Sequence, residues 1–543
     1  MSARTPVGTG MPLRDFRVHR YVNAFCPRCH AERPDQPLAD VRRLSGWLAI
    51  RDGKVWLERG CPEHGFISTL YDESAEILRY LEEWTATTKE HVADRMGNFA
   101  PVPAAYLDGM PHMQTQHTCI LLADITDTCN LRCPTCFAES APARQTTAPL
   151  AQVLASVDDR LAKERGRLDV LMLSGGEPTL HPDFERLLDE LVARPIIRIL
   201  VNTNGIRLAQ DDALLAALVR HRERVEVYLQ FDGLTPAGSV HHRGADLLRF
   251  KQAALQRLTG AGVFTTLTLT AALGVNDDQI GPVSRLALDT PFVGGVTIQP
   301  VFGSGRSAGI DPLDRLTHTG VLARLSAQTD GLVSWRDLTA LPCSHPHCAS
   351  VGYLLRDDGG QWRSLVSLIG PERLKGYLDL APDELANRFA DQELPARLRA
   401  SVKDSLLGLL SEQSSVSHPD LGRIWKDICT TCDIGIGTLT TLAASRLPGQ
   451  AHRLRTMLAE RVLRVTVKPF MDINTMIEER LTQCCVHVGT VNPADGGHQC
   501  APFCALQAWA PLSRTRLSTA AGSAGAQLLD VPTLPPHPVE VPR

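Results

Sequence analysis

The chain carries three cysteines on one short segment, DTCNLRCPTCFAES, at Cys129, Cys133 and Cys136. With fifteen cysteines scattered at random over the chain, a triple of this spacing would occur in roughly one sequence in a hundred. Three thiolates on one loop can hold three corners of a cubane 4Fe–4S cluster, and no fourth cysteine follows nearby. The spacing therefore predicts a cluster with one iron open to another ligand.

An open iron on a redox cluster can chelate the amino and carboxylate groups of S-adenosylmethionine (SAM) and deliver an electron to its sulfonium. Reductive cleavage of the C–S bond would then yield a 5′-deoxyadenosyl radical. The C-x3-C-x2-C loop, followed by the aromatic Phe137, resembles the signature of the radical SAM superfamily. We therefore predict that Cys129, Cys133 and Cys136 are the catalytic cluster ligands.

Further motifs support this resemblance. Gly175-Gly176-Glu177-Pro178 matches the superfamily's Gly-Gly-Glu motif, whose carbonyls and carboxylate hold the methionine ammonium, and glycine permits close backbone approach. VNTNG at 201–205 resembles the Thr-Asn-Gly turn of the subgroup that includes the first enzyme of molybdenum-cofactor synthesis. Each motif alone is usually an ordinary turn, but their order favours one site. The resemblance implies that the cofactor is bound by Phe137, Gly175, Gly176, Glu177, Pro178, Asn202, Thr203, Asn204, Gln230, Asp232 and Gln299.

The elements that must position these residues alternate between strand-like and helix-like runs. Strands are predicted at 117–126, 169–174, 196–201, 224–231, 264–270 and 295–300, and helices at 149–164, 181–194 and 246–258. Such units predict an α/β fold, a parallel sheet with outer helices that closes partly into a barrel of the radical SAM type. Every motif follows a predicted strand, at the end where barrel enzymes gather their active sites.

The N-terminal part contains two knuckles some 35 residues apart, CPRC and CPEH. The segment between them has the pattern of a β-hairpin around Asp52-Gly53. Unligated buried cysteines are the alternative reading, but paired two-residue spacings seldom arise without a metal. We predict a ribbon around one tetrahedral zinc or iron ion, held by Cys26, Cys29, Cys61 and His64, with His30 as the rival fourth ligand.

Eight more cysteines lie in the C-terminal part, at Cys343, Cys348, Cys429, Cys432, Cys484, Cys485, Cys500 and Cys504. Eight thiols would suffice for two auxiliary four-cysteine 4Fe–4S clusters. Zinc sites, or one extra cluster with spare thiols, are the alternatives. Adjacent residues point apart in an extended backbone, so Cys484 and Cys485 serve different clusters or only one of them ligates. His345, His347 and His487 could substitute as ligands, and Cys119 is expected to be a buried hydrophobe.

Most of the chain resembles one branch of the superfamily, the archaeal tetraether lipid synthase and the class D radical methyltransferases that act on a pterin precursor. The shared segments include CPRC, CPEHG, LQFDG, QPVFGSGR, LPCSHPHC, FMDINTMIEERLTQCCVHVGT and APFCALQ. The synthase carries a rubredoxin-like metal, a radical cluster and two auxiliary clusters. The resemblance implies C–C bond formation, by coupling or methylation, at an unactivated carbon of a lipid or small molecule. The alternative is methylation of a pterin-like heterocycle, with a folate-type methylene carrier as donor.

The composition of the chain bears on non-enzyme functions and on its location. Lys plus Arg number 56 against 60 Asp plus Glu, and aromatic residues are 5%, which disfavours a nucleic-acid-binding or multi-zinc scaffold, the non-enzyme alternative. No apolar run reaches the ~18 residues of a membrane span, and the opening segment lacks a signal peptide's apolar core, so a cytoplasmic location is expected.

We expect an N-terminal module at 1–105, a core barrel at 115–325, an auxiliary-cluster domain at 326–515 and a disordered tail at 516–543. The expected partners are a small-molecule or lipid substrate and an electron donor such as a ferredoxin or flavodoxin. No nucleic acid and no transmembrane segment are expected, and transient contact with a membrane surface stays open.

Overall fold

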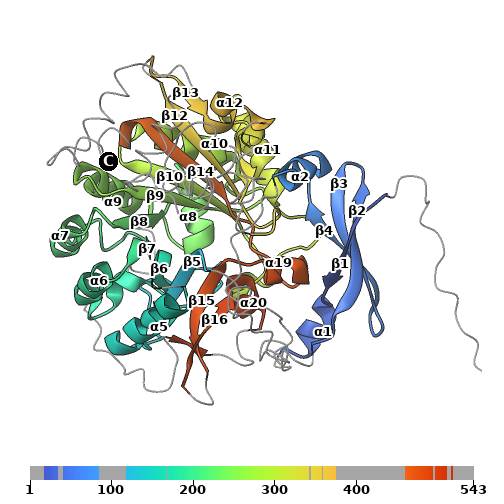
Figure 1. The fold of residues 1–543 in the computed structure, drawn as a ribbon, viewed down its shortest axis with the longest axis horizontal. Helices are drawn as coiled ribbons and strands as arrows, with labels where there is room; N and C mark the ends of the chain where they lie inside the picture. The colour runs from blue at the N-terminus through green and yellow to red at the C-terminus, as the bar shows by residue number, and fades with distance from the viewer. Residues whose placement is uncertain are drawn as a thin grey trace, which may run out of the picture.

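A computed structural model describes residues 17–34, 41–84, 118–374, 459–509 and 515–517, apart from 165, 167, 342, 343, 358, 373 and 493–495. Figure 1 shows a small N-terminal sheet in blue beside a large sheet flanked by helices. The predicted tail beyond residue 517, and Cys343, Cys429 and Cys432, lie outside the described residues.

The N-terminal sheet is antiparallel, with its strands in chain order. The predicted hairpin is confirmed, because Asp52 (φ 49°) and Gly53 (φ 73°) join two strands in left-handed conformations suited to a tight turn. The elements of this part are β1 (Arg17–Ala24), α1 (Pro27–Glu32), β2 (Leu44–Arg51), β3 (Lys54–Cys61), β4 (Gly65–Asp72) and α2 (Ala75–Glu82).

Six consecutive parallel strands form the centre of the large sheet. They are β5 (Ile120–Thr126), β6 (Leu168–Gly175), β7 (Ile196–Thr203), β8 (Val225–Gln230), β9 (Thr265–Ala271) and β10 (Val293–Pro300). Each coincides with a predicted strand to within a few residues. The predicted α/β fold with a parallel sheet is therefore confirmed.

Amphipathic helices cover this sheet. In α6 (Phe184–Val192) the buried side chains are Phe184, Leu187, Leu188 and Leu191, which share one helix face because of their spacing. The other helices here are α5 (Leu150–Lys163), η3 (Pro178–Leu180), α7 (Asp212–Arg220), α8 (Pro236–Arg243), α9 (Leu248–Gly260), η4 (Asp277–Gln279), α10 (Ile280–Asp289), η5 (Gly305–Ser307), α11 (His318–Gln328) and η6 (Trp335–Asp337). No helix in the described part of the chain has the length and apolar character needed to cross a membrane.

C-terminal strands extend both edges of the parallel sheet. β14 (Val462–Val467) pairs in parallel with β10, and β15 (Val486–Val491) pairs in parallel with β5. These additions cover edges that would otherwise present unpaired backbone groups. The sheet therefore runs across the boundary expected at residue 326, and a separate auxiliary domain stays a prediction.

Antiparallel strands continue outward from these two additions. The remaining elements are β11 (Thr339–Ala340), β12 (Ser350–Arg356), β13 (Trp362–Ser364) and α12 (Leu365–Ile369) near β14, and α19 (Glu478–Thr482), β16 (His498–Pro502), α20 (Phe503–Ala508) and β17 (Thr515–Arg516) near β15.

Buried hydrogen bonds fasten the N-terminal sheet to the rest of the molecule. The Asp72 carboxylate accepts from the backbone N–H of Thr319 at 2.8 Å. The buried Arg59 guanidinium donates to the carbonyl oxygen of Asn474 at 3.0 Å. The ribbon is thus held against segments that follow β10 and β14.

Candidate active site

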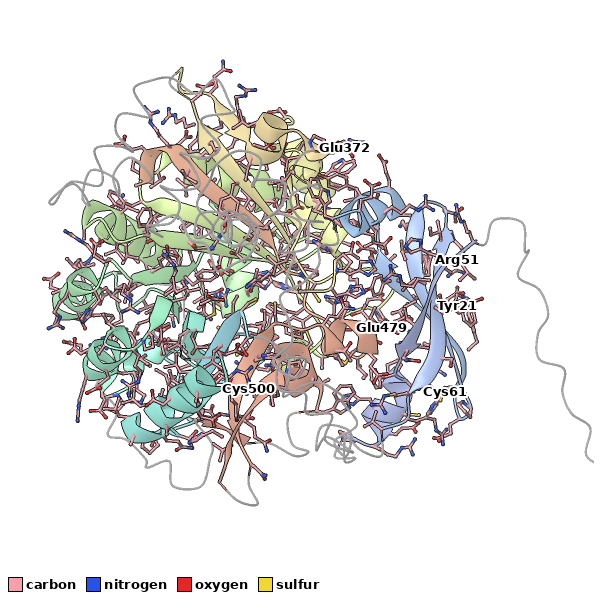
Figure 2. The ribbon with its side chains drawn as sticks, in the orientation of Figure 1. Tyr21, Arg51, Cys61, Glu372, Glu479 and Cys500 are labelled. Atoms are coloured by element: carbon pink, nitrogen blue, oxygen red, sulfur yellow. The ribbon has the colours of Figure 1, made fainter. Side chains whose placement is uncertain are left out.

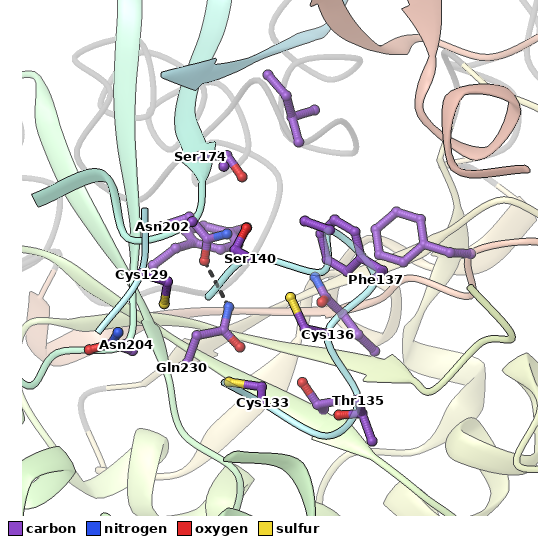
Figure 3. A pocket seen from close by; sticks show the side chains of 18 of the residues that line it. Cys129, Cys133, Thr135, Cys136, Phe137, Ser140, Ser174, Asn202, Asn204 and Gln230 are labelled. Atoms are coloured by element: carbon purple, nitrogen blue, oxygen red, sulfur yellow. Dashed lines mark hydrogen bonds between the residues drawn. The ribbon is translucent and has the colours of Figure 1, made fainter. Parts of the chain in front are cut away.

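A cavity lies at the carboxyl ends of the parallel strands, and the three predicted cluster cysteines line it. Figure 3 shows the sulfur atoms of Cys129, Cys133 and Cys136 turned toward one shared space. The space between its walls measures about 1280 Å³ when the solvent at its open mouth is included.

The cysteine loop follows β5 and is held by the loop after β10. The Arg306 side chain donates to the carbonyl oxygens of Cys133 at 2.6 Å and Ser140 at 2.9 Å. The backbone N–H of Arg306 donates to the carbonyl oxygen of Cys136 at 3.1 Å. Gly305 has φ 53°, and a Cβ there would lie 2.6 Å from the Cys136 oxygen. Sequence reasoning missed Arg306, because it is 173 residues from Cys133 in the chain.

Replacing Arg306 by methionine is expected to loosen the cysteine loop. The variant loses two charge-assisted hydrogen bonds, each worth about 1.5–3 kcal/mol. After anaerobic reconstitution it should release iron to a chelator faster than the parent protein. Arg285→Met is the matched control, because that side chain is 42% exposed and pairs with the exposed Asp330. Equal iron-release rates for all three proteins would contradict the prediction.

The Gly175-Gly176-Glu177 turn packs against the backbone that leads into the cysteine loop. A Cβ on Gly175 would lie 2.3 Å from the carbonyl oxygen of Thr126, and one on Gly176 would lie 2.1 Å from that of Thr128. The backbone N–H of Glu177 donates to the same Thr128 oxygen at 2.9 Å. Only glycine fits this approach, which places the turn next to the cysteines.

The buried Glu177 carboxylate organises the neighbouring strand end. It accepts from the hydroxyl groups of Thr203 at 2.6 Å and Thr179 at 2.7 Å, and from the backbone N–H of Asn204 at 2.8 Å. The family resemblance implies that this carboxylate contacts the cofactor's ammonium. In this structure its oxygens hold the Thr203-Asn204 turn at the cavity wall.

A polar network crosses the cavity at the ends of β7 and β8. Gln230 donates to Asn202 Oδ1 at 2.7 Å, the dashed contact in Figure 3, and its own Oε1 accepts from Arg243 at 2.8 Å. Arg243 makes two further contacts of 2.7 Å with the Asp232 carboxylate. Burial raises the pKa of Asp232, but Arg243 outweighs burial and holds it below its ordinary value. Arg243, which sequence reasoning missed, is therefore a fixed cation in the cavity.

Nine of the eleven predicted cofactor-binding residues line the cavity: Phe137, Gly175, Gly176, Glu177, Asn202, Thr203, Asn204, Gln230 and Gln299. The other two, Asp232 and Pro178, stay predictions. Asp232 is buried behind Arg243, and Pro178 begins the buried turn η3, so neither side chain lines the cavity. Both support residues that do.

The three cysteines suit a cluster better than a single ion. Burial raises the pKa of the Cys129 and Cys133 thiols, so they need a cationic centre to become thiolates. In the part of the chain that the structure describes, the sulfurs of these three cysteines do not all lie within 4.8 Å of one another. Their sulfurs are thus too far apart for one ion, and a cubane cluster spreads its ligands more widely.

Phenylalanines line one side of the same cavity. The Phe137 ring centroid lies 5.3 Å from that of Phe503 and 5.9 Å from that of Phe302, and Phe470 lies 4.4 Å from Phe503. Sequence reasoning identified only Phe137. Lys468, at the end of β14, also lines the cavity, so the C-terminal residues contribute to its wall.

The N-terminal ribbon brings its predicted ligands together at one end of the sheet, where Figure 2 labels Cys61. His64 Nδ1 lies 3.5 Å, 3.3 Å and 3.6 Å from the sulfurs of Cys26, Cys29 and Cys61. The edges of a tetrahedron around zinc are about 3.5–3.8 Å for ordinary Zn–S and Zn–N bonds. The donor set therefore fits one tetrahedral ion.

The fourth position belongs to His64 rather than His30 in this geometry. His30 packs edge-to-face against Trp509, with ring centroids 6.2 Å apart. His64 Nε2 instead lies 2.9 Å from a Glu32 carboxylate oxygen, an arrangement that orients a metal-binding imidazole.

His64→Ala is expected to weaken metal binding at the ribbon strongly, because it removes one of four ligands. The loss should exceed the about 10–100-fold typical for removal of a supporting carboxylate. His30→Ala is the matched control and should retain the metal. Chelator competition, followed by metal analysis, measures both variants. Greater loss from His30→Ala than from His64→Ala would reverse the ligand assignment.

The described C-terminal cysteines fall into different surroundings. The Cys484 residue is half-buried, and the charges of Cys504 and Cys348 act on its pKa, so these three share one neighbourhood. Cys500 sits on β16, labelled in Figure 2, where Arg160 and Lys163 of α5 act on it. The structure therefore does not bring Cys500 together with the other three.

Three further predictions concern Cys485, Cys119 and the histidines. Cys485 is buried in the main hydrophobic core, and its carbonyl oxygen accepts from the backbone N–H of Cys119 at 2.9 Å. Cys119 is 1% exposed, as expected for a buried hydrophobe. His347 has both ring nitrogens in contact with side chains, Tyr71 Oη at 3.0 Å and Glu82 at 2.9 Å, so it is not an available ligand here.

Comparisons with known proteins agree with this geometry. The model of the radical SAM superfamily matches residues 124–287, and the model of the HMPTM N-terminal zinc ribbon domain matches residues 18–73. A 7,8-dihydro-6-hydroxymethylpterin dimethyltransferase from Methanocaldococcus jannaschii is 24% identical over 506 residues, 89% of this chain and 92% of that protein. A mycofactocin maturase from Mycobacterium ulcerans is 30% identical over 42% of this chain and 58% of its own length.

Among solved structures, a radical SAM methyltransferase from Sphaerobacter thermophilus matches with a TM-score of 0.28 and 15% identity, over 59% of this chain and 75% of that one. The family matches coincide with the cysteine loop and the knuckles described above. The chain is therefore a radical SAM enzyme, with a radical SAM domain preceded by a zinc ribbon.

Proposed function

We propose that this enzyme is a methyltransferase that acts on a reduced pterin or a similar planar heterocycle. The supporting relative, named as a pterin dimethyltransferase, aligns over nearly the whole of both chains. The observation that carries the proposal is the cavity itself, which combines an aromatic wall with a row of amide side chains beside the cluster cysteines.

The cavity residues divide between cofactor and substrate. With a 4Fe–4S cluster and SAM bound, the site would supply one-electron cleavage of SAM to a 5′-deoxyadenosyl radical. Cys129, Cys133 and Cys136 would hold the cluster, and the Gly175-Gly176 turn would lie along SAM.

The lining favours a flat polar ring over a lipid chain. Aromatic rings stack on planar heterocycles, and Asn202, Gln230 and Gln299 offer amide donors and acceptors to ring nitrogens and oxygens. A lipid tail would require a long apolar tunnel. Arg243 and Lys468 instead place two cationic side chains in the cavity lining.

Two cofactor assignments belong to the same proposal. We infer that the ribbon holds zinc, because its ligand spacing and family match both fit that ion. We also infer that Cys348, Cys484 and Cys504 anchor an auxiliary iron–sulfur cluster. A one-electron carrier such as a ferredoxin or flavodoxin would supply the electrons.

The test is an anaerobic assay of reconstituted enzyme with SAM, a reductant, a methylene-carrying reduced folate and 7,8-dihydro-6-hydroxymethylpterin. Mass spectrometry should detect 5′-deoxyadenosine and a pterin heavier by one or two methyl groups. Separate ¹³C labels on the SAM methyl and the folate methylene identify the carbon donor. Cleavage of SAM without any methylated pterin, together with coupling of a supplied saturated lipid, would overturn the proposal.

A further inference from the structure

Arg480 of α19 is a buried cation beside the C-terminal thiols. It is 5% exposed. Its Nε donates to the sulfur of Cys348 at 3.4 Å, and one terminal nitrogen donates to the carbonyl oxygen of Pro469 at 2.8 Å. Its charge also lowers the pKa of Tyr71 of the N-terminal ribbon, although burial raises that pKa overall. Arg480 thus touches a cysteine that the proposed function assigns to an auxiliary cluster.

No described carboxylate forms an ion pair with Arg480, whereas the buried Arg198 and Arg315 each have one. Arg198 pairs with Glu226 at 2.5 Å, and Arg315 pairs with Asp472 at 2.6 Å. A buried guanidinium without a counter-charge is costly, because its hydration is lost and nothing replaces it. The anionic partner of Arg480 must therefore come from groups other than the described acids.

The thiols around Arg480 are the available source of negative charge. The sulfur of Cys348 accepts from Arg480 Nε at 3.4 Å, and the charge of Cys504 also acts on the guanidinium. Three neutral thiols would leave the guanidinium without a counter-charge, and three bare thiolates would carry more negative charge than one arginine balances. Metal ions that bind thiolate would complete the charge balance, so the donor set fits an iron–sulfur cluster.

The residue before Cys348 is fixed to the N-terminal ribbon by side-chain contacts. His347 Nδ1 lies 3.0 Å from Tyr71 Oη. The other ring nitrogen lies 2.9 Å from Glu82, and Glu82 also contacts His19 at 2.9 Å. The backbone that carries Cys348 is therefore held in place beside Arg480.

We propose that Arg480 is the positioning and charge-compensating residue of an auxiliary iron–sulfur cluster at Cys348, Cys484 and Cys504, and that it raises the reduction potential of that cluster. The inference rests on the auxiliary-cluster part of the proposed function. Net charge and hydrogen bonds to sulfur set the potential of such clusters. A cation that donates to a ligating sulfur stabilises the more negative reduced state.

The experiment isolates the auxiliary cluster in the full-length chain. Cys129, Cys133 and Cys136 are first replaced together by alanine, so that remaining iron–sulfur signals come from auxiliary sites. Arg480→Met and Arg480→Lys are then made in this background and reconstituted anaerobically. Redox titration followed by electron paramagnetic resonance measures the midpoint potential, and iron and sulfide analysis measures cluster content.

Arg480→Met should raise the ratio of oxidised to reduced cluster, measured at a fixed potential, by at least about tenfold. For a one-electron couple this equals a fall of the midpoint potential by about 59 mV. Arg480→Lys keeps the charge and should shift it less. Arg336→Met, at an exposed position paired with Glu76, is the control and should leave the titration unchanged.

An unchanged midpoint potential in Arg480→Met, measured with full cluster content, would overturn the inference. Equal loss of the cluster from both Arg480 variants would also overturn it, because the positive charge that lysine keeps would then make no difference. Absence of any iron–sulfur signal in the parent background would instead remove the auxiliary cluster from the proposed function. That outcome would leave the methyltransferase proposal standing, because pterin methylation is assayed separately with the unmodified enzyme.

Discussion

Cys133→Ala is expected to abolish formation of 5′-deoxyadenosine from SAM. Cys133 is one of three thiols on the loop and is itself buried, and Arg306 fixes its carbonyl oxygen, so neither solvent nor a loop shift can replace the lost ligand. The loss of activity should exceed about 100-fold, because even second-shell changes at metal sites cost about 10–100-fold. Anaerobic incubation with SAM and dithionite, followed by chromatography of 5′-deoxyadenosine, measures the effect.

Cys119→Ala is the matched control for this variant. Cys119 is also a buried thiol and lies directly before β5, but it does not line the cavity. That variant should retain both iron and 5′-deoxyadenosine formation. If Cys133→Ala still cleaves SAM at a rate near that of the Cys119 variant, the assignment of the cluster loop is wrong.

Gly176→Ala is the second change with a large expected effect. The added Cβ would lie 2.1 Å from the carbonyl oxygen of Thr128, and its nearest neighbours are all backbone atoms, so side-chain movement cannot relieve the contact. Overpacking of this kind costs about 1–3 kcal/mol of folding stability, and here it also pushes the turn away from the cysteine loop. SAM affinity, measured by equilibrium dialysis, and iron content should both fall.

Gly260→Ala provides the comparison, because a Cβ at the end of α9 meets nothing within 4 Å. It should leave the melting temperature and SAM binding close to those of the parent protein. Retention of SAM affinity by Gly176→Ala would show that the turn does not depend on close approach to Thr128.

The parallel sheet was predictable because its strands are continuous apolar runs that alternate with amphipathic helices. Such patterns are local, so β5 to β10 and α5, α6 and α9 follow from periodicity alone. β14 and β15 were not assigned to this sheet. Their sequences, VLRVTV and VHVGTV, are apolar and β-branched, but nothing local tells which sheet edge they join.

The candidate site was predictable to the extent that its parts lie close together in the chain. The cluster loop and the Gly-Gly-Glu turn are short motifs, and the structure places them in contact. The supporting cations could not be found in this way. Arg306 is 173 residues from Cys133, and Arg480 is 132 residues from Cys348.

The sequence by itself determined the order of strands and helices, the three-cysteine loop and the metal-binding knuckles, because each depends on spacing within a few turns of chain. Only the tertiary structure decided that C-terminal strands extend both sheet edges, that His64 rather than His30 completes the ribbon site, and that Arg243, Arg306 and Arg480 stand beside the thiols. Those outcomes depend on contacts between distant segments, which burial and backbone pairing select only once the chain has folded.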